Sequence, residues 1–342
     1  MKVIKYPAKE EWSEIVKRPH LDVSKLNATV QGVLDDVKKH GDEAVKRYEE
    51  MFDHAHLDSL AVTEAEIEEA EQLVSQELKD ALHLAHHNIA AFHQSQKFAG
   101  EKVETCPGVT CWQKSVAIQK VGLYIPGGTA PLFSTVLMLA TPAKIAGCEE
   151  IVLCTPPNQE GKVNPAILMA AKIAGVSKIF KAGGVQAIGA MADGTEGVPN
   201  VYKIFGPGNQ FVMAAKQQVS LHDVAIDMPA GPSEVCLIAD ETANPVFAAA
   251  DLLSQAEHGF DSQVFFITTS EKVLAEVKKE VEAQLERLPR KEMAQTSLDN
   301  SKFILVKDDE EAINLCNTYA PEHLIIATAN YEQLAERVVN AG

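Results

Sequence analysis

The sequence has a shortage of basic residues, no long apolar run and no paired-cysteine motif. Its 31 Lys and Arg are outnumbered by 48 Asp and Glu, so the formal net charge is −17. A surface of this sign repels nucleic acid and anionic membranes, which we therefore exclude as partners. The longest apolar stretch, residues 131–140, is too short to cross a bilayer and is interrupted by Ser134 and Thr135.

The start of the sequence and its cysteines favour a cytoplasmic protein. Residues 1–12 are interspersed with charged side chains and lack an apolar core of signal-peptide length. The six cysteines include no CxxC spacing. Cys106 and Cys111 flank a Pro-Gly turn, and a disulfide could join them, but free thiols are the expectation for a cytoplasmic chain.

The length and the apolar periodicity predict α/β domains with a helical region at the start. Apolar residues recur at helical spacing over residues 23–37 until Gly41, and Thr63 with Glu66 forms a capping box for another helix. From Ser115 onward, expected strands alternate with expected helices. This alternation is typical of right-handed βαβ units, in which helices cover both faces of a parallel sheet.

The expected strands are too many for one compact sheet, so we predict two. The fold class is therefore α/β, with two Rossmann-like parallel-sheet domains and a helical N-terminal region. Proline and glycine at residues 228–234 mark the break between them. We expect a short extension (1–20), a first domain with the helical part (21–123 and 234–342) and a second domain (124–233). The expected strands are 115–124, 151–154, 178–181, 201–205, 235–239, 264–269, 303–306 and 324–327. The expected helices of the α/β region are 131–146, 165–174, 186–192, 209–219, 245–255, 272–288, 308–319 and 331–340.

Three glycine-containing loops, 124–131, 183–184 and 206–211, follow expected strands and precede helices. Glycines there let backbone N–H groups approach an anion at a helix N-terminus. The third loop matches the dinucleotide fingerprint only in part, because Phe211 replaces the last glycine. Asp227 follows at the spacing of a ribose-binding acid. Together the loops favour a phosphate-containing ligand at the carboxyl ends of the strands.

Two short segments far apart in the sequence carry groups suited to catalysis. Gln255 and His258 lie three residues apart at the end of an expected helix, so they share one face. Glu322 and His323 put a carboxylate and an imidazole into a loop bounded by Pro321. A folded cleft that joins the two segments would hold a metal or a polar substrate beside a proton-transfer site.

Six segments in consistent order, spread over most of the chain, resemble histidinol dehydrogenase. That family oxidises L-histidinol to L-histidine, the last step of histidine biosynthesis, through an aldehyde and with two NAD molecules. The resemblance implies that Tyr124, Gln186 and Asn209 contact NAD. It also implies a homodimer. The matching segments are 121–143, 183–188, 206–209, 227–234, 253–259 and 320–324.

The same resemblance assigns the substrate, metal and acid–base residues. Ser233, Gln255, His258 and His323 would contact L-histidinol, and Gln255 and His258 would also bind zinc, which in the family mainly anchors the substrate. Glu322 and His323 would be the acid–base pair. These residue types suit the chemistry, since an imidazole can accept the hydroxyl proton as hydride leaves and a carboxylate can deprotonate the water that hydrates the aldehyde. NAD itself accepts the hydride.

The chain departs from the family at its end. Family members continue through a C-terminal domain that supplies an aspartate and a histidine to the zinc site, and neither is present by Gly342. We therefore expect weak zinc binding and poor activity from these 342 residues alone. One alternative is a non-catalytic remnant that binds NAD. Another, a sugar-phosphate enzyme, would need a basic residue inside the glycine loops, and Lys120 and Lys203 lie outside them.

Overall fold

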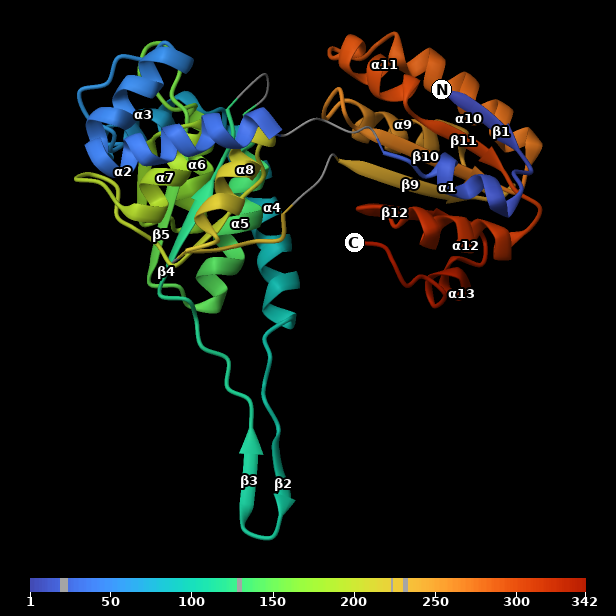
Figure 1. The fold of residues 1–342 in the computed structure, drawn as a ribbon, viewed down its shortest axis with the longest axis horizontal. Coiled ribbons are helices and arrows are strands. Elements are labelled where there is room, and N and C mark those ends of the chain that lie inside the picture. The colour runs from blue at the N-terminus through green and yellow to red at the C-terminus, as the bar shows by residue number, and fades with distance from the viewer. Residues whose placement is uncertain (19–23, 128–130, 223, 230–232) are drawn as a thin grey trace. The chain divides into compact units, whose positions relative to one another are not determined.

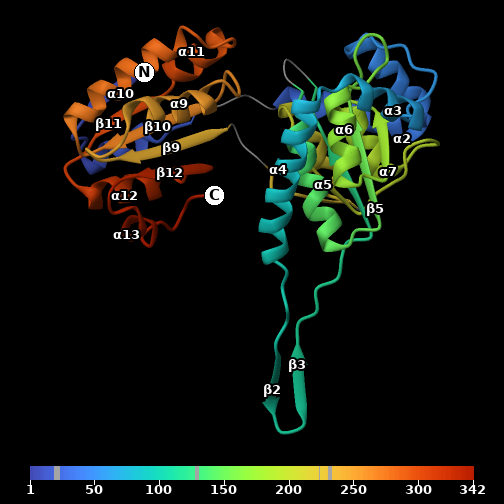
Figure 2. The same cartoon turned by 180° about the vertical axis from the view of Figure 1, so that it is seen from behind.

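The chain forms two compact units. Unit 1 comprises Met1–Leu21 and Ala230–Gly342, and unit 2 comprises Asp22–Pro229. Each unit contains one five-stranded sheet whose strands all run parallel, with helices on both faces (Figures 1 and 2). This confirms the predicted α/β fold class with two parallel sheets. The computed structural model describes residues 1–18, 24–127, 131–222, 224–229 and 233–342.

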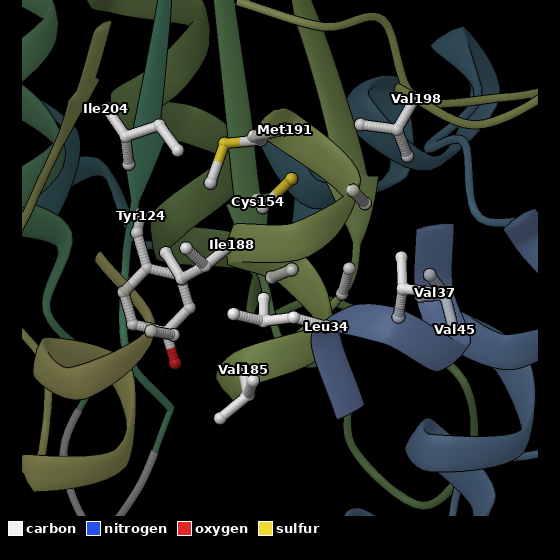
Figure 3. Close-up of a cluster of buried hydrophobic side chains, with 14 of the residues drawn as sticks. Leu34, Val37, Val45, Tyr124, Cys154, Val185, Ile188, Met191, Val198 and Ile204 are labelled. Carbon is white, nitrogen blue, oxygen red and sulfur yellow. The ribbon is translucent and has the colours of Figure 1, made fainter. Parts of the chain in front are cut away.

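The sheet of unit 2 has the strand order β6-β5-β4-β7-β8. Successive side chains of a strand face opposite sides of a sheet, and this alternation divides the core in two. Tyr124 and Cys154 face the cluster under α2, α7 and α8 (Figure 3), whereas Leu123 and Leu153 face the cluster under α3, α4, α5 and α6. The strands are β4 (Lys120–Tyr124), β5 (Glu150–Thr155), β6 (Lys178–Lys181), β7 (Lys203–Phe205) and β8 (Ala225–Ile226). The helices are α2 (Ser24–Phe52), α3 (Glu64–Leu73), α4 (Gln76–Ser95), α5 (Phe133–Ala146), α6 (Pro165–Ala174), α7 (Gly184–Asp193) and α8 (Gln210–Val219).

The N-terminal helices pack within unit 2, whereas the sequence led us to group residues 21–123 with 234–342. The apolar face of α2, including Val30 and Val37, joins the cluster that contains α7 and α8. Gly41 interrupts α2 with a φ of 55°, where the sequence predicted the end of a helix, but the chain resumes helical structure beyond it. The capping box at Thr63 and Glu66 forms as predicted.

An antiparallel hairpin, β2 (Lys102–Cys106) and β3 (Val109–Trp112), extends from the end of α4 (Figures 1 and 2). No sequence pattern predicted this hairpin. All of its residues are exposed, so it lacks the one-sided apolar alternation that marks a packed strand. Cys106 pairs with Val109 and Cys111 with Val103, and both thiols are free.

The sheet of unit 1 has the strand order β1-β11-β10-β9-β12. Helices α9, α10 and α11 cover one face, and α1, α12 and α13 cover the other. The strands are β1 (Lys2–Lys5), β9 (Glu234–Ala239), β10 (Gln263–Thr268), β11 (Lys302–Leu305) and β12 (His323–Ala327). The helices are η1 (Lys9–Glu11), α1 (Trp12–Ile15), α9 (Pro245–Ala256), α10 (Glu271–Leu285), α11 (Lys291–Asp299), α12 (Asp309–Tyr319) and α13 (Tyr331–Ala335).

Three elements of unit 1 differ from the sequence prediction. The strand β1 was missed, because four residues with lysine at both ends read as polar, and such a sequence suits the sheet edge where β1 lies. The expected helix 272–288 ends at Leu285, and a separate helix, α11, follows. The expected helix 331–340 stops at Ala335. Among the described residues, no helix combines the length and apolarity that a membrane crossing requires.

Candidate functional site

The residues proposed for substrate and acid–base chemistry gather at one edge of the unit 1 sheet. Ser233 directly precedes β9, Glu322 directly precedes β12, and Gln255 lies in the last turn of α9, the helix that leads toward β10. Because β9 lies between β10 and β12 and all three strands are parallel, their amino ends meet at the same edge. The tertiary structure therefore brings together segments that are about 65 residues apart in the sequence.

Backbone pairing fixes the place of the two acid–base residues. His323 opens β12, one residue earlier than expected, and lies in register with Val235. The backbone N–H of Glu234 donates to Oε2 of Glu322 at 3.3 Å. Nε2 of His323 lies 3.8 Å from Oε1 of Glu322, although neighbours on an extended segment alternate in direction. The two side chains are 59% and 42% exposed, so solvent and substrate can reach both.

Gln255 and His258 present nitrogen and oxygen groups at the end of α9. Gln255 is buried, and its Nε2 has no hydrogen-bond partner within the described residues. His258 is exposed and lies just beyond the helix, with Nδ1 3.0 Å from the carbonyl of Ser254. Nδ1 therefore carries the proton as a donor, and the lone pair of Nε2 is available to a metal.

These two side chains fit part of a zinc site. Zinc prefers a tetrahedral set of four ligands, with imidazole nitrogen among the most common. Gln255 and His258 account for two of those positions, and no group of three His, Cys, Asp or Glu gathers anywhere in the described part of the chain. A metal held at this edge would thus use His258 as its strong ligand and Gln255 as a weak one.

Arg18 holds the segment that carries Glu322 and His323, and no sequence pattern pointed to it. Its Nε and Nη2 bind the two carboxylate oxygens of Glu234, with Nη2 to Oε2 at 2.8 Å. Nη2 also donates to the carbonyls of Tyr319 at 2.8 Å and Ala320 at 3.0 Å. The guanidinium lies 4.9 Å from the centre of the Tyr319 ring. Hydrogen bonding to Glu234 raises the pKa of Arg18 above its usual value.

This arrangement connects Arg18 to the acid–base pair through Glu234. The Glu234 side chain is buried and binds Arg18, while the backbone N–H of the same residue holds Glu322. Ala320, at a positive φ of 52°, ends α12 and turns the chain toward Pro321. Non-glycine residues rarely adopt this conformation, so the donor from Arg18 to its carbonyl helps to hold a strained turn.

In unit 2, the three glycine loops lie at the carboxyl edge of the sheet, as predicted. Tyr124 ends β4, Gly183 follows β6, and Gly206 follows β7. Gly206 has a φ of 132°, and a Cβ there would lie 2.1 Å from the carbonyl oxygen of Tyr124, so only glycine permits this approach. Residues 128–130 of the first loop lie outside the described residues.

Several backbone N–H groups in these loops already bind side chains of the protein, whereas the sequence led us to expect them to face an anion. Gly184 donates to the hydroxyl oxygen of Tyr124 at 3.1 Å. Asn209 is the N-cap of α8, and its Oδ1 accepts from Phe211 and Val212 at 3.0 and 3.1 Å. The anion-binding capacity of these turns is therefore smaller than the glycine pattern suggests.

Asp227 also acts within the protein. Its Oδ2 accepts from the Gly206 N–H at 2.9 Å, and its Oδ1 forms an ion pair with Lys216. Lys216 is 1% exposed and also donates to the Gly206 carbonyl at 2.7 Å. Asp227, whose spacing suggested a ribose-binding acid, therefore binds the Gly206 N–H and Lys216 within the protein. The residues after β7 and β8 can meet in this way because the two strands end at the same sheet edge.

Of the three residues proposed to contact NAD, Gln186 has the most unusual surroundings. It lies in the first turn of α7, is 1% exposed, and donates from Nε2 to Oε1 of Glu49 at 2.9 Å. Its own Oε1 is buried and has no partner within the described residues. Tyr124 is also buried, and burial raises the pKa of its hydroxyl. Glu49 lies in α2, and no sequence pattern marked it as a functional residue.

Comparisons with known proteins agree over most of the chain. The sequence profile of histidinol dehydrogenase matches residues 16–342. The histidinol dehydrogenase of Bacteroides thetaiotaomicron is 67% identical over 342 residues, which is 100% of this chain and 80% of that protein. That of Escherichia coli (strain K12) is 50% identical over 97% of this chain and 76% of its own length. The crystal structure of histidinol dehydrogenase from Elizabethkingia anophelis matches with a TM-score of 0.97 at 50% identity, over 100% of this chain and 79% of that one.

Proposed function

Because the chain belongs to the histidinol dehydrogenase family and is therefore an enzyme, we propose that it catalyses the NAD-dependent, four-electron oxidation of L-histidinol to L-histidine through the aldehyde. The observation that carries this proposal is the meeting of Ser233, Gln255, Glu322 and His323 at the amino edge of one sheet. That edge offers a base, an acid, a metal ligand and a hydroxyl within one unit, as a polar amino alcohol requires.

We propose that His323 is the base of the first oxidation. Hydride leaves the alcohol carbon only as the hydroxyl proton is removed, and an imidazole has its ordinary pKa near working pH. The exposed His323 ring can receive that proton at Nε2, with Glu322 3.8 Å away to stabilise the imidazolium that results. We propose that Ser233, which directly precedes β9, contacts the substrate beside His323.

The second oxidation requires a hydrated aldehyde, and we propose that Glu322 deprotonates the attacking water. The Glu234 N–H holds Oε2 of Glu322 at 3.3 Å, so the carboxylate is oriented while Oε1 remains open to a proton. The exposed His323 first returns its proton to solvent, and it then accepts the hydroxyl proton of the hydrate as a second hydride departs. Tyr124, Gln186 and Asn209 of unit 2 would hold NAD, which would supply the hydride acceptor.

The test compares Glu322→Gln and His323→Asn with an exposed control, Glu310→Gln, in NADH formation from L-histidinol with added zinc. Loss of a general acid or base typically costs about 10²–10⁴-fold in rate. His323→Asn should lower the rates of both oxidations, whereas Glu322→Gln should lower the rate of histidinol oxidation to the aldehyde only modestly and block the second oxidation. Wild-type rates in both site variants would refute these assignments.

We also propose that zinc binds at Gln255 and His258 and anchors nitrogen donors of the substrate. The free Nε2 of His258 supports this, and Gln255 would offer its carbonyl oxygen Oε1 as the second ligand. His258→Ala should lower the zinc content per chain, while the exposed His83→Ala should leave it unchanged. Equal zinc in both variants, or none in the wild type, would contradict the site.

A homodimer is the assembly that the family pattern implies, and we propose it for this protein. Sedimentation velocity on the purified chain should give about twice the monomer mass of 37.1 kDa. A single species at the monomer mass over a wide concentration range would contradict the proposal.

A further inference from the structure

A buried carboxylate of α2 lies directly beneath the turn that opens α7. Oε1 of Glu49 accepts the backbone N–H of Gly183 at 2.8 Å and the side-chain amide of Gln186 at 2.9 Å. Glu49 is 0% exposed. Its second oxygen, Oε2, is buried and receives no donor within the described residues. A carboxylate that uses one oxygen fully and leaves the other unpaired in a buried place needs a proton or a cation there.

The described groups around Glu49 include a second acid and no Lys or Arg. Asp53 lies four residues after Glu49, just beyond the end of α2 at Phe52, and its Oδ2 is 3.4 Å from where a Cβ of Gly183 would lie. His54 follows Asp53 outside the helix and opposes the raised pKa of Asp53, and Tyr124 on β4 and Cys154 on β5 are titratable groups near Glu49. Within the described part of the chain, neither Glu49 nor Asp53 forms an ion pair with Lys or Arg. Two carboxylates in these surroundings are most stable with one proton between them.

We propose that Glu49 and Asp53 form a positioning pair for the nucleotide site, in which one shared proton keeps Gln186 and the Gly183–Gly184 turn in the arrangement that binds the ligand. This inference rests on the proposed function, since it takes Tyr124 and Gln186 to contact NAD. The ligand group that it serves is a hydrogen-bond donor, such as a carboxamide or a ribose hydroxyl. Glu49 and Asp53 do not touch the reacting atoms.

The hydrogen bonds determine which end of the Gln186 amide faces the ligand. Oε1 of Glu49 is an acceptor for two N–H groups, so Gln186 must turn its NH₂ toward Glu49 and its carbonyl oxygen away. That carbonyl oxygen is the buried acceptor without a partner. On the other side of the turn, the Tyr124 oxygen accepts from Gly184, which leaves the phenolic proton free to donate.

The proton belongs on Oε2 of Glu49, between that oxygen and Asp53, because Oε1 is already fully engaged. Burial raises the pKa of Glu49 to about 7, with the charge of Asp53 adding to the effect. Burial likewise raises the pKa of Asp53. Above neutral pH the pair loses its proton, and two negative charges then repel beneath the Gly183–Gly184 turn. The affinity for an anionic dinucleotide should therefore fall as the pH rises through about 7.

The experiment measures NADH affinity by nucleotide fluorescence on the whole chain from pH 6 to pH 9. In the wild type, the dissociation constant of NADH should rise by about tenfold over this range. This follows because a change of about one unit in the pKa of the pair on NADH binding changes the affinity by a factor of ten. Glu49→Gln keeps an acceptor oxygen for Gly183 and Gln186 and offers its own NH₂ to Asp53. This variant therefore imitates the protonated pair, and its affinity should be tight and independent of pH.

Three further variants separate positioning from a general structural role. Asp53→Asn should also remove the pH dependence, because its NH₂ can donate to Glu49. Glu49→Leu should bind NADH more than tenfold more weakly at every pH, since the turn loses its acceptor. The exposed neighbour Glu50→Gln makes the same charge change on the same helix and should keep the wild-type profile.

The possible failures are distinguishable. A wild type whose NADH affinity does not change with pH, or a Glu49→Gln variant that retains the wild-type profile, would overturn the positioning pair alone. A wild type that binds no NADH at any pH would overturn the nucleotide site of unit 2, and the pair with it.

Discussion

Replacing Arg18 with alanine should destabilise unit 1 strongly, because the change leaves a buried carboxylate without its cation. Glu234 has a side chain that is only 6% exposed, and it loses both donors of the guanidinium. The carbonyls of Tyr319 and Ala320 lose a charged donor as well. Breaking a buried ion pair by removing one partner costs about 3–5 kcal/mol. Since the Arg18 side chain is 40% exposed, we expect the lower end, about 3 kcal/mol.

The two tryptophans of the chain allow this loss to be measured in unit 1 alone. Trp12 is buried in the core of unit 1, whereas Trp112 is exposed on the hairpin of unit 2. In a Trp112→Phe background, the fluorescence of Trp12 therefore reports the unfolding of unit 1. At a slope of about 2 kcal/mol per M, the urea midpoint of Arg18→Ala should fall by about 1.5 M.

Two control variants test whether the unpaired buried charge of Glu234 causes this loss of stability. Lys17→Ala removes the neighbouring cation, whose pair with Glu14 is exposed, and should change the free energy of unfolding by less than about 0.5 kcal/mol. Adding Glu234→Gln to Arg18→Ala should restore part of the loss, since a buried amide costs less than a buried charge. A loss below about 1 kcal/mol in Arg18→Ala, or no recovery in the double variant, would show that the buried charge is not the cause.

Two further perturbations concern unit 2. Glu49 has a folded-state pKa of about 7 against a usual 4.5, so the stability it contributes is fully present below pH 4.5 and is lost as the pH rises through 7. The wild type should therefore lose roughly a few kcal/mol of unfolding free energy relative to Glu49→Gln over this interval, measured by urea unfolding followed by circular dichroism; parallel pH profiles would contradict it. Lys216→Met should lower the free energy of unfolding of unit 2 by about 2 kcal/mol and weaken NADH binding, because the buried amine binds both Asp227 and the Gly206 carbonyl. A variant as stable as the wild type would show that these two contacts of Lys216 contribute little.

The regular α/β elements were predictable because their signals are local. Buried parallel strands read as short apolar runs, and amphipathic helices separate them, so the strands 151–154 and 178–181 were located to within a residue or two. The elements that were missed lack such signals. The strand β1 has a polar sequence and lies at a sheet edge, β8 has only two residues, and the β2–β3 hairpin is exposed on every side.

The fold class, the glycine turns and the residue types of the two polar segments follow from the amino-acid order alone, since each depends on neighbours within a few positions. The groups that support them are set by long-range contacts in the folded chain. Arg18 binds Glu234 across 216 positions, and Glu49 reaches Gly183 across 134. No periodicity records such pairs, because they depend on strand order and on how α2 packs against α7. Burial, which gives Glu49 its raised pKa, likewise exists only once unit 2 has folded.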